Sequence, residues 1–336
     1  MKNLMEKKVH RWATEANAAG DFGARDEITE TNLKIHYFAS RLYSNYEPSL
    51  PPNPDFLARF ESWISNVSSD ADQRILFHLV PEIFYIGNEE FNALYRSAYR
   101  GPIARWLVDL SNLSFESKNA EESLDALASE TWFCPITDSM RISAFFHVNN
   151  VPSHIDHRPH WRTLRQFGSE KRILDYVAEN EIKRIVLLED FVGTGTQARK
   201  AIEFAGNLRP ASPIPVLVVP LVICPKAEQA IAQLNLPGHV TVAPVLRLPK
   251  RAFICEPPEG EEPQLLAAIR ALASRTYLVV SDGEAPNNKK KPFGPLGYKA
   301  TGGLVVMYSN APDNTLPIIH WRSKKWKPLF PRHSRA

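Results

Sequence analysis

The stretch LLEDFVGTGTQARKAI, residues 187–202, decides how this chain is interpreted. An apolar segment runs into two adjacent carboxylates, Glu189 and Asp190, and a loop of glycine, threonine and glutamine follows at 193–197. After the loop, the apolar spacing is that of a helix. The question is why a buried strand should end in two acids and pass into so many small residues.

A strand, turn and helix without a ligand is the first interpretation of residues 184–202. Two adjacent acids on a strand point to opposite faces of the sheet and need partners, which disfavours an interpretation without a ligand. Two glycines and two threonines are also more than a plain turn requires.

A dinucleotide fingerprint is the second interpretation, because residues 193–198 formally fit GxGxxA. In that motif an acid closes the following strand, whereas here the acids precede the loop and residues 214–226 contain none. A Walker A loop is excluded, since no Gly-Lys-Ser/Thr is present.

A ribose 5-phosphate site is the third interpretation, and it accounts for every residue. Backbone N–H groups of a glycine-rich loop that opens a helix bind phosphate, assisted by the helix dipole. Carboxylates on the preceding strand accept hydrogen bonds from vicinal hydroxyls.

The stretch resembles the motif with which type I phosphoribosyltransferases bind phosphoribosyl pyrophosphate (PRPP). The resemblance implies that Glu189 and Asp190 contact the ribose hydroxyls, and that Asp190 acts indirectly on Mg²⁺. It implies a phosphate loop made of Gly193, Thr194, Gly195, Thr196 and Gln197. Some purine-type members have an aspartate as general base where Gly193 stands, so purine salvage is disfavoured.

The carboxy-terminal half is similar to a narrower group, the phosphoribosyltransferase-like proteins of bacterial conflict and anti-phage loci, some of which accompany retrons. The similarity rests on residues 134–147, 187–197 and 294–321 and covers about residues 70–330. It implies an effector directed at nucleotides or nucleobases, with a regulatory protein or a retron-type complex as a partner.

Composition sets the protein class. The chain has 336 residues, of which 44% are apolar and 23% charged, and its net charge of +3 is too small to argue for nucleic acid. Cys134, Cys224 and Cys255 form no CxxC pair, which disfavours a disulfide framework or a zinc site. The amino terminus lacks the apolar core of a signal peptide, and the apolar run 214–224 is too short to cross a bilayer. We therefore expect a cytoplasmic protein without a membrane segment.

The pattern along the chain predicts helices first and then alternating strands and helices. We expect a helical extension over 1–120 and an α/β domain over 121–336, of the type I phosphoribosyltransferase-like fold, with a mainly parallel sheet flanked by helices. The expected strands include 131–136, 184–190 and 214–223, the last ending near Pro220. The expected helices include 138–148 with Asp138 as N-cap, 169–180 and 197–207.

A second loop, ITDSMR at 136–141, is placed to bind pyrophosphate. Its candidate residues are Thr137, Asp138, Ser139 and Arg141. The alternative is an ordinary N-cap followed by a surface arginine.

Three further regions carry weaker signals. His154, His157 and His160 lie in 153–162, which is interpreted as a solvated loop, a basic lid or a zinc site. The basic loop 281–303, with Lys289, Lys290 and Lys291, is interpreted as solvated, as a lid or as a nucleic-acid contact. A base pocket is predicted from Asn314, Thr315 and Trp321, although Trp321 equally suits a core.

Together these signals predict attack at ribose C1 through an oxocarbenium-like transition state, either glycosyl transfer or N-glycosidic cleavage. PRPP or a nucleotide is the expected ligand, Mg²⁺ the cofactor, and Arg141 a stabiliser of the leaving group. Two alternatives remain: a non-catalytic sensor of PRPP or a nucleotide, and an adaptor that binds nucleic acid through Lys289–Lys291 and the basic tail 322–335.

Overall fold

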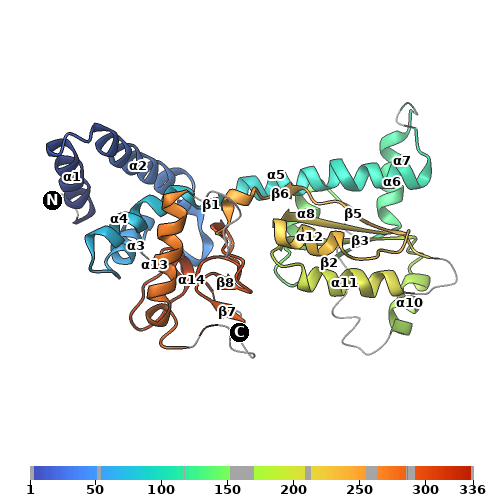
Figure 1. Ribbon diagram of the computed structural model, residues 1–336. Coiled ribbons are helices and arrows are strands. Elements are labelled where there is room, and N and C mark those ends of the chain that lie inside the picture. Colours follow the sequence, from blue (N-terminus) through green and yellow to red (C-terminus); the bar gives the residue numbers. More distant parts are fainter. Residues whose placement is uncertain are drawn as a thin grey trace. The chain divides into compact units, whose positions relative to one another are not determined.

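The chain forms two compact units in the computed structural model, which describes residues 4–50, 54–114, 116, 118–151, 170–208, 213–254, 263–284, 286 and 292–333 (Figure 1). Unit 1 comprises Met1–Asn88 and Lys250–Ala336, and unit 2 comprises Glu89–Pro249. Unit 2 is thus a continuous segment inserted between the two segments that form unit 1. This grouping differs from the division at residue 120 that the sequence pattern suggests.

Unit 1 is mainly helical. Its helices and helical turns are α1 (Leu4–Ala18), α2 (Phe22–Arg41), η1 (Tyr43–Asn45), η2 (Glu47–Ser49), α3 (Phe56–Ile64), α4 (Asp70–Leu79), η3 (Val80–Glu82), η6 (Lys250–Ala252), α13 (Gln264–Val280) and α14 (Pro317–His320). Its strands are short: β1 (Phe84–Ile86) and β9 (Val305–Met307) pair in parallel, and β7 (Phe293–Gly294) and β8 (Gly297–Tyr298) form an antiparallel pair.

Side-chain caps mark where α2, α3 and α4 begin. The carboxylate of Asp21 accepts a hydrogen bond from the Ala24 amide, and Asp55 does the same for α3 at 2.8 Å. Ser69 caps α4. Such caps each stabilise a helix by about 1 kcal/mol.

The carboxy-terminal segment completes the core of the amino-terminal helices. The indole Nε1 of Trp63 donates to the Ile318 carbonyl at 2.7 Å, and the Tyr46 hydroxyl donates to the Pro331 carbonyl at 2.8 Å. Phe330 is fully buried among aromatic rings. Residues more than 200 positions apart therefore share one core, which explains why unit 1 is built from both ends of the chain.

Unit 2 carries the α/β architecture. Its elements are α5 (Asn88–Ala98), the π-helical η4 (Tyr99–Ile103), α6 (Ala104–Ser111), α7 (Ala120–Ser129), β2 (Thr131–Pro135), α8 (Ile142–Asn149), α10 (Glu170–Glu179), β3 (Arg184–Val192), α11 (Thr196–Asn207), β4 (Val216–Ile223), α12 (Pro225–Ala232), β5 (Val240–Val242) and β6 (Leu246–Arg247). The strands are ordered β2-β3-β4-β5, with β6 also on β4, and every pair is parallel.

Both faces of this sheet are covered. Alternate residues such as Trp132, Leu187 and Val218 form one buried cluster with α10, α11 and α12. On β2 the intervening Phe133 contacts Phe145 and Phe146 of α8. Figure 1 shows α10 and α11 on one side of the sheet and α5 and α6 on the other. The expected α/β fold, with a mainly parallel sheet flanked by helices and a helical amino-terminal region, is confirmed.

Two details of the strands correct the sequence-based expectation. Strand β3 continues two residues beyond Asp190, so the acidic pair lies within it. Pro220 does not end its strand but lies inside β4, in register with Glu189. Its carbonyl accepts from the Val245 amide at 2.9 Å, between β5 and β6, so the missing N–H faces a break in the ladder.

No helix in the part of the chain that the structure describes has the length and apolar composition needed to cross a membrane.

Phe330 tests whether the two ends of the chain share one core. We expect Phe330→Ala to destabilise unit 1 by roughly 3–5 kcal/mol, because the truncation leaves a cavity in a closely packed aromatic cluster. Urea unfolding followed by tryptophan fluorescence measures the loss. Phe22→Ala is the matched control, since Phe22 is 58% exposed. Equal effects of the two substitutions would contradict the shared core.

His320 predicts a pH dependence of unit 1. Burial lowers the pKa of this imidazole from 6.5 to about 4. In the unfolded chain the ring protonates near pH 6.5, so the stability it contributes is present above that pH and is lost as the pH falls towards 4. We expect His320→Gln to remove roughly 3 kcal/mol of this pH dependence. Urea unfolding of both proteins between pH 7 and 4.5 measures it, and parallel pH profiles would refute it.

Candidate functional site

The acidic pair lies on the central part of the unit 2 sheet. Glu189 and Asp190 are 3% and 5% exposed on β3, with β4 on one side and the segment that follows β2 on the other. A buried carboxylate is costly unless donors surround it. The structure provides those donors from the segment that follows β2.

A chain of short contacts joins the two acids through that segment. The backbone amide of Thr137 donates to Glu189 Oε2 at 2.9 Å, and the Thr137 hydroxyl donates to Glu189 Oε1 at 2.7 Å. Thr137 Oγ1 lies 2.6 Å from Ser139 Oγ, which donates to Asp190 Oδ1 at 2.9 Å. The Phe191 amide also donates to Asp190 Oδ1, at 2.8 Å. The predicted ribose-binding acids and two of the predicted pyrophosphate-binding residues are thus in direct contact.

Parallel pairing of β2 and β3 produces this contact. Cys134 and Leu187 are in register, and the Ile136 amide donates to the Leu188 carbonyl at 2.8 Å just beyond β2. Because the carboxyl ends of parallel strands meet at one edge, Thr137 arrives beside Glu189. The two sequence motifs are therefore in contact in the folded protein.

The glycine loop lies directly after the acids, where β3 ends at Val192 and α11 begins at Thr196. Gly195 is the N-cap residue with φ +75°, a left-handed conformation that favours glycine. A Cβ there would lie 3.5 Å from Ala227, which is ordinary contact, so backbone conformation and not space selects glycine. Helix α11 has no acidic residue in its first turn, so its positive dipole end is unopposed there.

Two threonines bracket Gly195. Thr194 Oγ1 and Thr196 Oγ1 are 3.1 Å apart, and both residues are partly exposed. Gln197 is exposed, whereas Gly193 is buried. The loop thus adds hydroxyl donors to the backbone N–H groups of a helix amino terminus, which favours an anion there. The predicted start of this helix, at 197, is one residue late.

The segment 138–141 is not the start of a helix, contrary to the expectation. Helix α8 begins at Ile142 with Arg141 as its N-cap residue and no side-chain cap, so Asp138 is not a cap. A tight turn, in which the Ile142 amide donates to the Met140 carbonyl at 2.9 Å, precedes it. Asp138 and Arg141 are both exposed. The role of Arg141 with a leaving group stays a prediction.

The residues of the predicted base pocket lie in unit 1, not in unit 2 with the acids. The Asn314 amide donates to Thr301 Oγ1 at 2.8 Å, and the Thr315 hydroxyl donates to the Val305 carbonyl. Trp321 is half-buried, with its ring 5.5 Å from that of Phe293. These contacts serve the core of unit 1, and a base pocket at these residues stays a prediction.

Several sequence candidates fall outside the described residues. They are the histidine region 153–162, Lys289, Lys290 and Lys291, and Cys255. Cys134 and Cys224 are buried and free, and burial raises the pKa of the Cys224 thiol. Within the described ranges, no group of three or more His, Cys, Asp or Glu side chains is arranged to hold a metal ion.

Sequence reasoning missed one residue that the structure makes prominent. Arg59 is only 7% exposed, on the buried face of α3 between Phe56 and Trp63. A cation at helical spacing from two aromatic core positions was the available signal. Its surroundings form a second candidate site in unit 1.

The site can now be compared with known proteins. The family model PRTase-CE matches residues 60–332, which is most of the chain and includes all of unit 2 and part of unit 1. The chain belongs to the PRTase-CE family. It is thus a phosphoribosyltransferase-like protein. No curated protein and no solved structure matches it.

Thr137 tests the contact between the two motifs. We expect Thr137→Val to destabilise unit 2 by about 1–3 kcal/mol, because the buried Glu189 carboxylate loses a hydroxyl donor while the shape of the side chain is kept. Chemical unfolding measures the change. Thr276→Val is the control, since that hydroxyl only donates to a carbonyl within α13. A Thr137→Val effect no larger than that of the control would contradict the role of the hydroxyl.

Proposed function

We propose that unit 2 binds a ribose 5-phosphate ligand, PRPP or a nucleotide, and acts at ribose C1. The reaction is glycosyl transfer to an acceptor or cleavage of an N-glycosidic bond. The observation that carries the proposal is the contact of Glu189 and Asp190 with Thr137 and Ser139, next to a glycine loop at the amino terminus of α11. Membership of the PRTase-CE family supports it.

Different residues would bind different parts of the ligand. The backbone and hydroxyl groups of 193–197 would bind the 5-phosphate, and Glu189 and Asp190 would accept hydrogen bonds from the ribose hydroxyls. These hydroxyls would replace Thr137 and Ser139 as donors, or add to them. Thr137, Ser139 and Arg141 would then face the pyrophosphate or the leaving base.

The chemistry follows from this placement. The bond between C1 and its leaving group breaks with the electron pair going to the leaving group, and a lone pair of the nucleophile forms the new bond to C1. Positive charge grows on the ribose ring in between, and two fixed carboxylates lower the free energy of that charge in a buried setting. Cationic Arg141 would stabilise the leaving anion.

Mg²⁺ suits the same residues. Asp190 would act on Mg²⁺ indirectly, through the ribose hydroxyls and water, while phosphate oxygens and water would complete the coordination shell of the ion. When bound, the ion would offset the charge of the pyrophosphate.

A non-catalytic sensor is the second candidate, and one observation favours it. Both oxygens of Glu189 and one of Asp190 already accept hydrogen bonds from 137–139. A ribose that takes over these acceptors would release the loop after β2, which couples ligand binding to a local movement without any chemistry. In anti-phage defence, a regulatory protein or a retron-type complex would bind differently to the two states of this loop.

Calorimetric titration with PRPP, with and without Mg²⁺, tests the proposal. We expect magnesium-dependent binding that Glu189→Ala/Asp190→Ala weakens by a hundredfold or more, since charged hydrogen bonds each contribute about 1.5–3 kcal/mol. Glu121→Ala/Glu122→Ala is the matched control, because it removes two adjacent, exposed carboxylates from the same unit.

A second variant guards against misfolding of the first. Thr194→Val/Thr196→Val removes the two loop hydroxyls and is expected to weaken binding while circular dichroism stays unchanged. Failure of PRPP and of every ribose 5-phosphate nucleotide to bind the wild type would refute the proposal. Turnover of PRPP in the presence of an acceptor would separate the enzyme from the sensor.

A further inference from the structure

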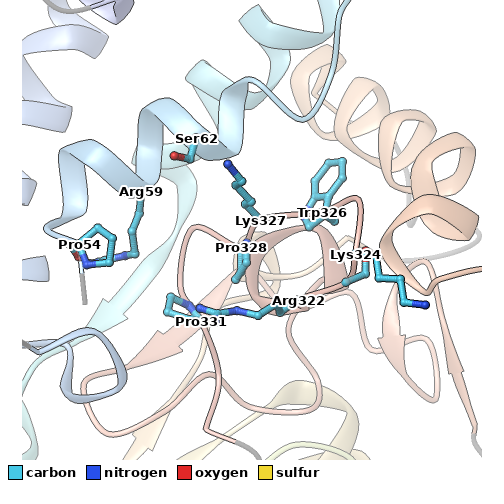
Figure 2. Close-up of a pocket in the computed structure, with 10 residues that line it drawn as sticks. Pro54, Arg59, Ser62, Arg322, Lys324, Trp326, Lys327, Pro328 and Pro331 are labelled. Atoms are coloured by element: carbon cyan, nitrogen blue, oxygen red, sulfur yellow. The ribbon is translucent and has the colours of Figure 1, made fainter. Parts of the chain in front are cut away.

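Unit 1 contains a pocket that the candidate site does not use. It has a volume of about 420 Å³ and lies between α3 and the segment 322–331 (Figure 2). Four cationic side chains line it, Arg59, Arg322, Lys324 and Lys327. None of the described residues that line it is acidic.

The carboxy-terminal segment forms a fixed wall of this pocket. The Asn66 amide group donates to the Lys327 carbonyl at 2.8 Å, and its oxygen accepts from the Lys327 amide at 3.0 Å. The Trp326 indole donates to the Ile318 carbonyl at 3.0 Å, and the amides of Leu329 and Phe330 both donate to Ile319. Backbone positions on both sides of the lysines are thus held, so the cations are presented by an ordered frame.

Arg59 is held deep in the same pocket. Its Nε donates to the Leu329 carbonyl at 3.0 Å and its Nη1 to the Pro54 carbonyl at 2.6 Å. Nη2 is buried and has no hydrogen-bond partner among the described residues. Desolvation lowers the pKa of this guanidinium to about 10. The guanidinium also lies over the Phe56 ring, 5.7 Å from its centroid. A buried cation whose hydrogen bonds go to neutral carbonyls creates a positive potential that an anion would relieve.

The other three cations of the pocket lack a salt-bridge partner in the described part of the chain. Within the described ranges, Arg322, Lys324 and Lys327 form no salt bridge, and all three are exposed. Asp55 lies close enough to act on Arg59, and Asp282 accepts from the Lys324 backbone amide. Four cations against these two carboxylates leave the pocket positive. Figure 2 shows the Lys324 ammonium directed away from Arg59, so Lys324 belongs to the rim.

Ser62 and Ser323 belong to the remaining lining, and the rest of it is apolar. Pro54, Trp326, Pro328 and Pro331 contribute to it, and Trp326 is 1% exposed. Pockets of roughly 300–1,000 Å³ with apolar walls and a few charged groups are those that bind small molecules. Arginine in particular suits the paired oxygens of a phosphate.

We propose that this pocket is a second ligand site, which binds the phosphate group of a mononucleotide-sized phosphomonoester. Arg322 and Lys327 contact the phosphate, Arg59 supplies the positive potential beneath it, and the prolines border the rest of the ligand. The site belongs to unit 1 and uses none of the residues of the acidic pair or the glycine loop. It therefore stands whether or not unit 2 binds PRPP.

Calorimetric titration of adenosine 5′-monophosphate, with orthophosphate and adenosine as partial ligands, tests the site. We expect the monophosphate to bind and Arg322→Gln/Lys327→Gln to weaken it about tenfold or more, since two charge-assisted contacts are lost. Lys7→Gln/Lys325→Gln is the matched control, because it removes the same charge from exposed positions of unit 1 outside the pocket. Arg59 is left intact, since its bonds to Leu329 and Pro54 support folding.

Two arms separate this site from other sources of binding. Titrations in a Glu189→Ala/Asp190→Ala background isolate unit 1, and the expected monophosphate affinity persists there. A 5′-phosphorylated and a 5′-hydroxyl oligonucleotide test whether a nucleic-acid end is the true ligand.

Three results would overturn the proposal. They are no monophosphate binding to the wild type, equal affinities of Arg322→Gln/Lys327→Gln and its control, and binding of the phosphorylated oligonucleotide without the free nucleotide.

Discussion

Buried carboxylates on β3 are the constraint on which the arrangement of unit 2 depends. Glu189 and Asp190 have almost no access to water, so folding requires donors close by. The parallel pairing of β2 with β3 brings Thr137 and Ser139 to them. The same edge of the sheet leads into the glycine loop, so the demand for donors and the geometry of the candidate site are met by one set of residues.

Much of this was predictable from sequence because the signals are local. Apolar runs with polar boundaries predicted β2, β3 and β4. The order of the acids, the glycines and the apolar helical spacing predicted that the loop 193–197 leads from β3 into a helix, which is α11. Pro220 was misjudged, because whether a strand proline is tolerated depends on where the neighbouring ladder breaks. Asp138 was misjudged as a cap for a related reason: sequence shows an acid before a helix but not the tight turn that delays it.

The organisation of unit 1 could not be predicted from local sequence patterns. Nothing near Tyr46, Trp63 or Phe330 indicates that they share a core, since their partners are more than 200 residues away. The burial of Arg59 could not be predicted for the same reason. The carboxy-terminal segment that covers this side chain, through the Leu329 carbonyl, lies far away in the sequence. The tail 322–333 reads as a charge run and is in fact part of the folded structure.

The split of unit 1 between the two ends of the chain has a consequence for the order of folding during synthesis. Unit 2 is a continuous stretch, and its sheet pairs strands that follow one another closely, so it has all its partners as soon as Pro249 leaves the ribosome. The first helices emerge long before but lack β9, α14 and the Phe330 ring that complete their core. Closing that core spans most of the chain, which makes it the slower step. Premature termination within the last stretch would thus spare the sheet and leave the amino-terminal helices exposed, a natural substrate for chaperones and proteases.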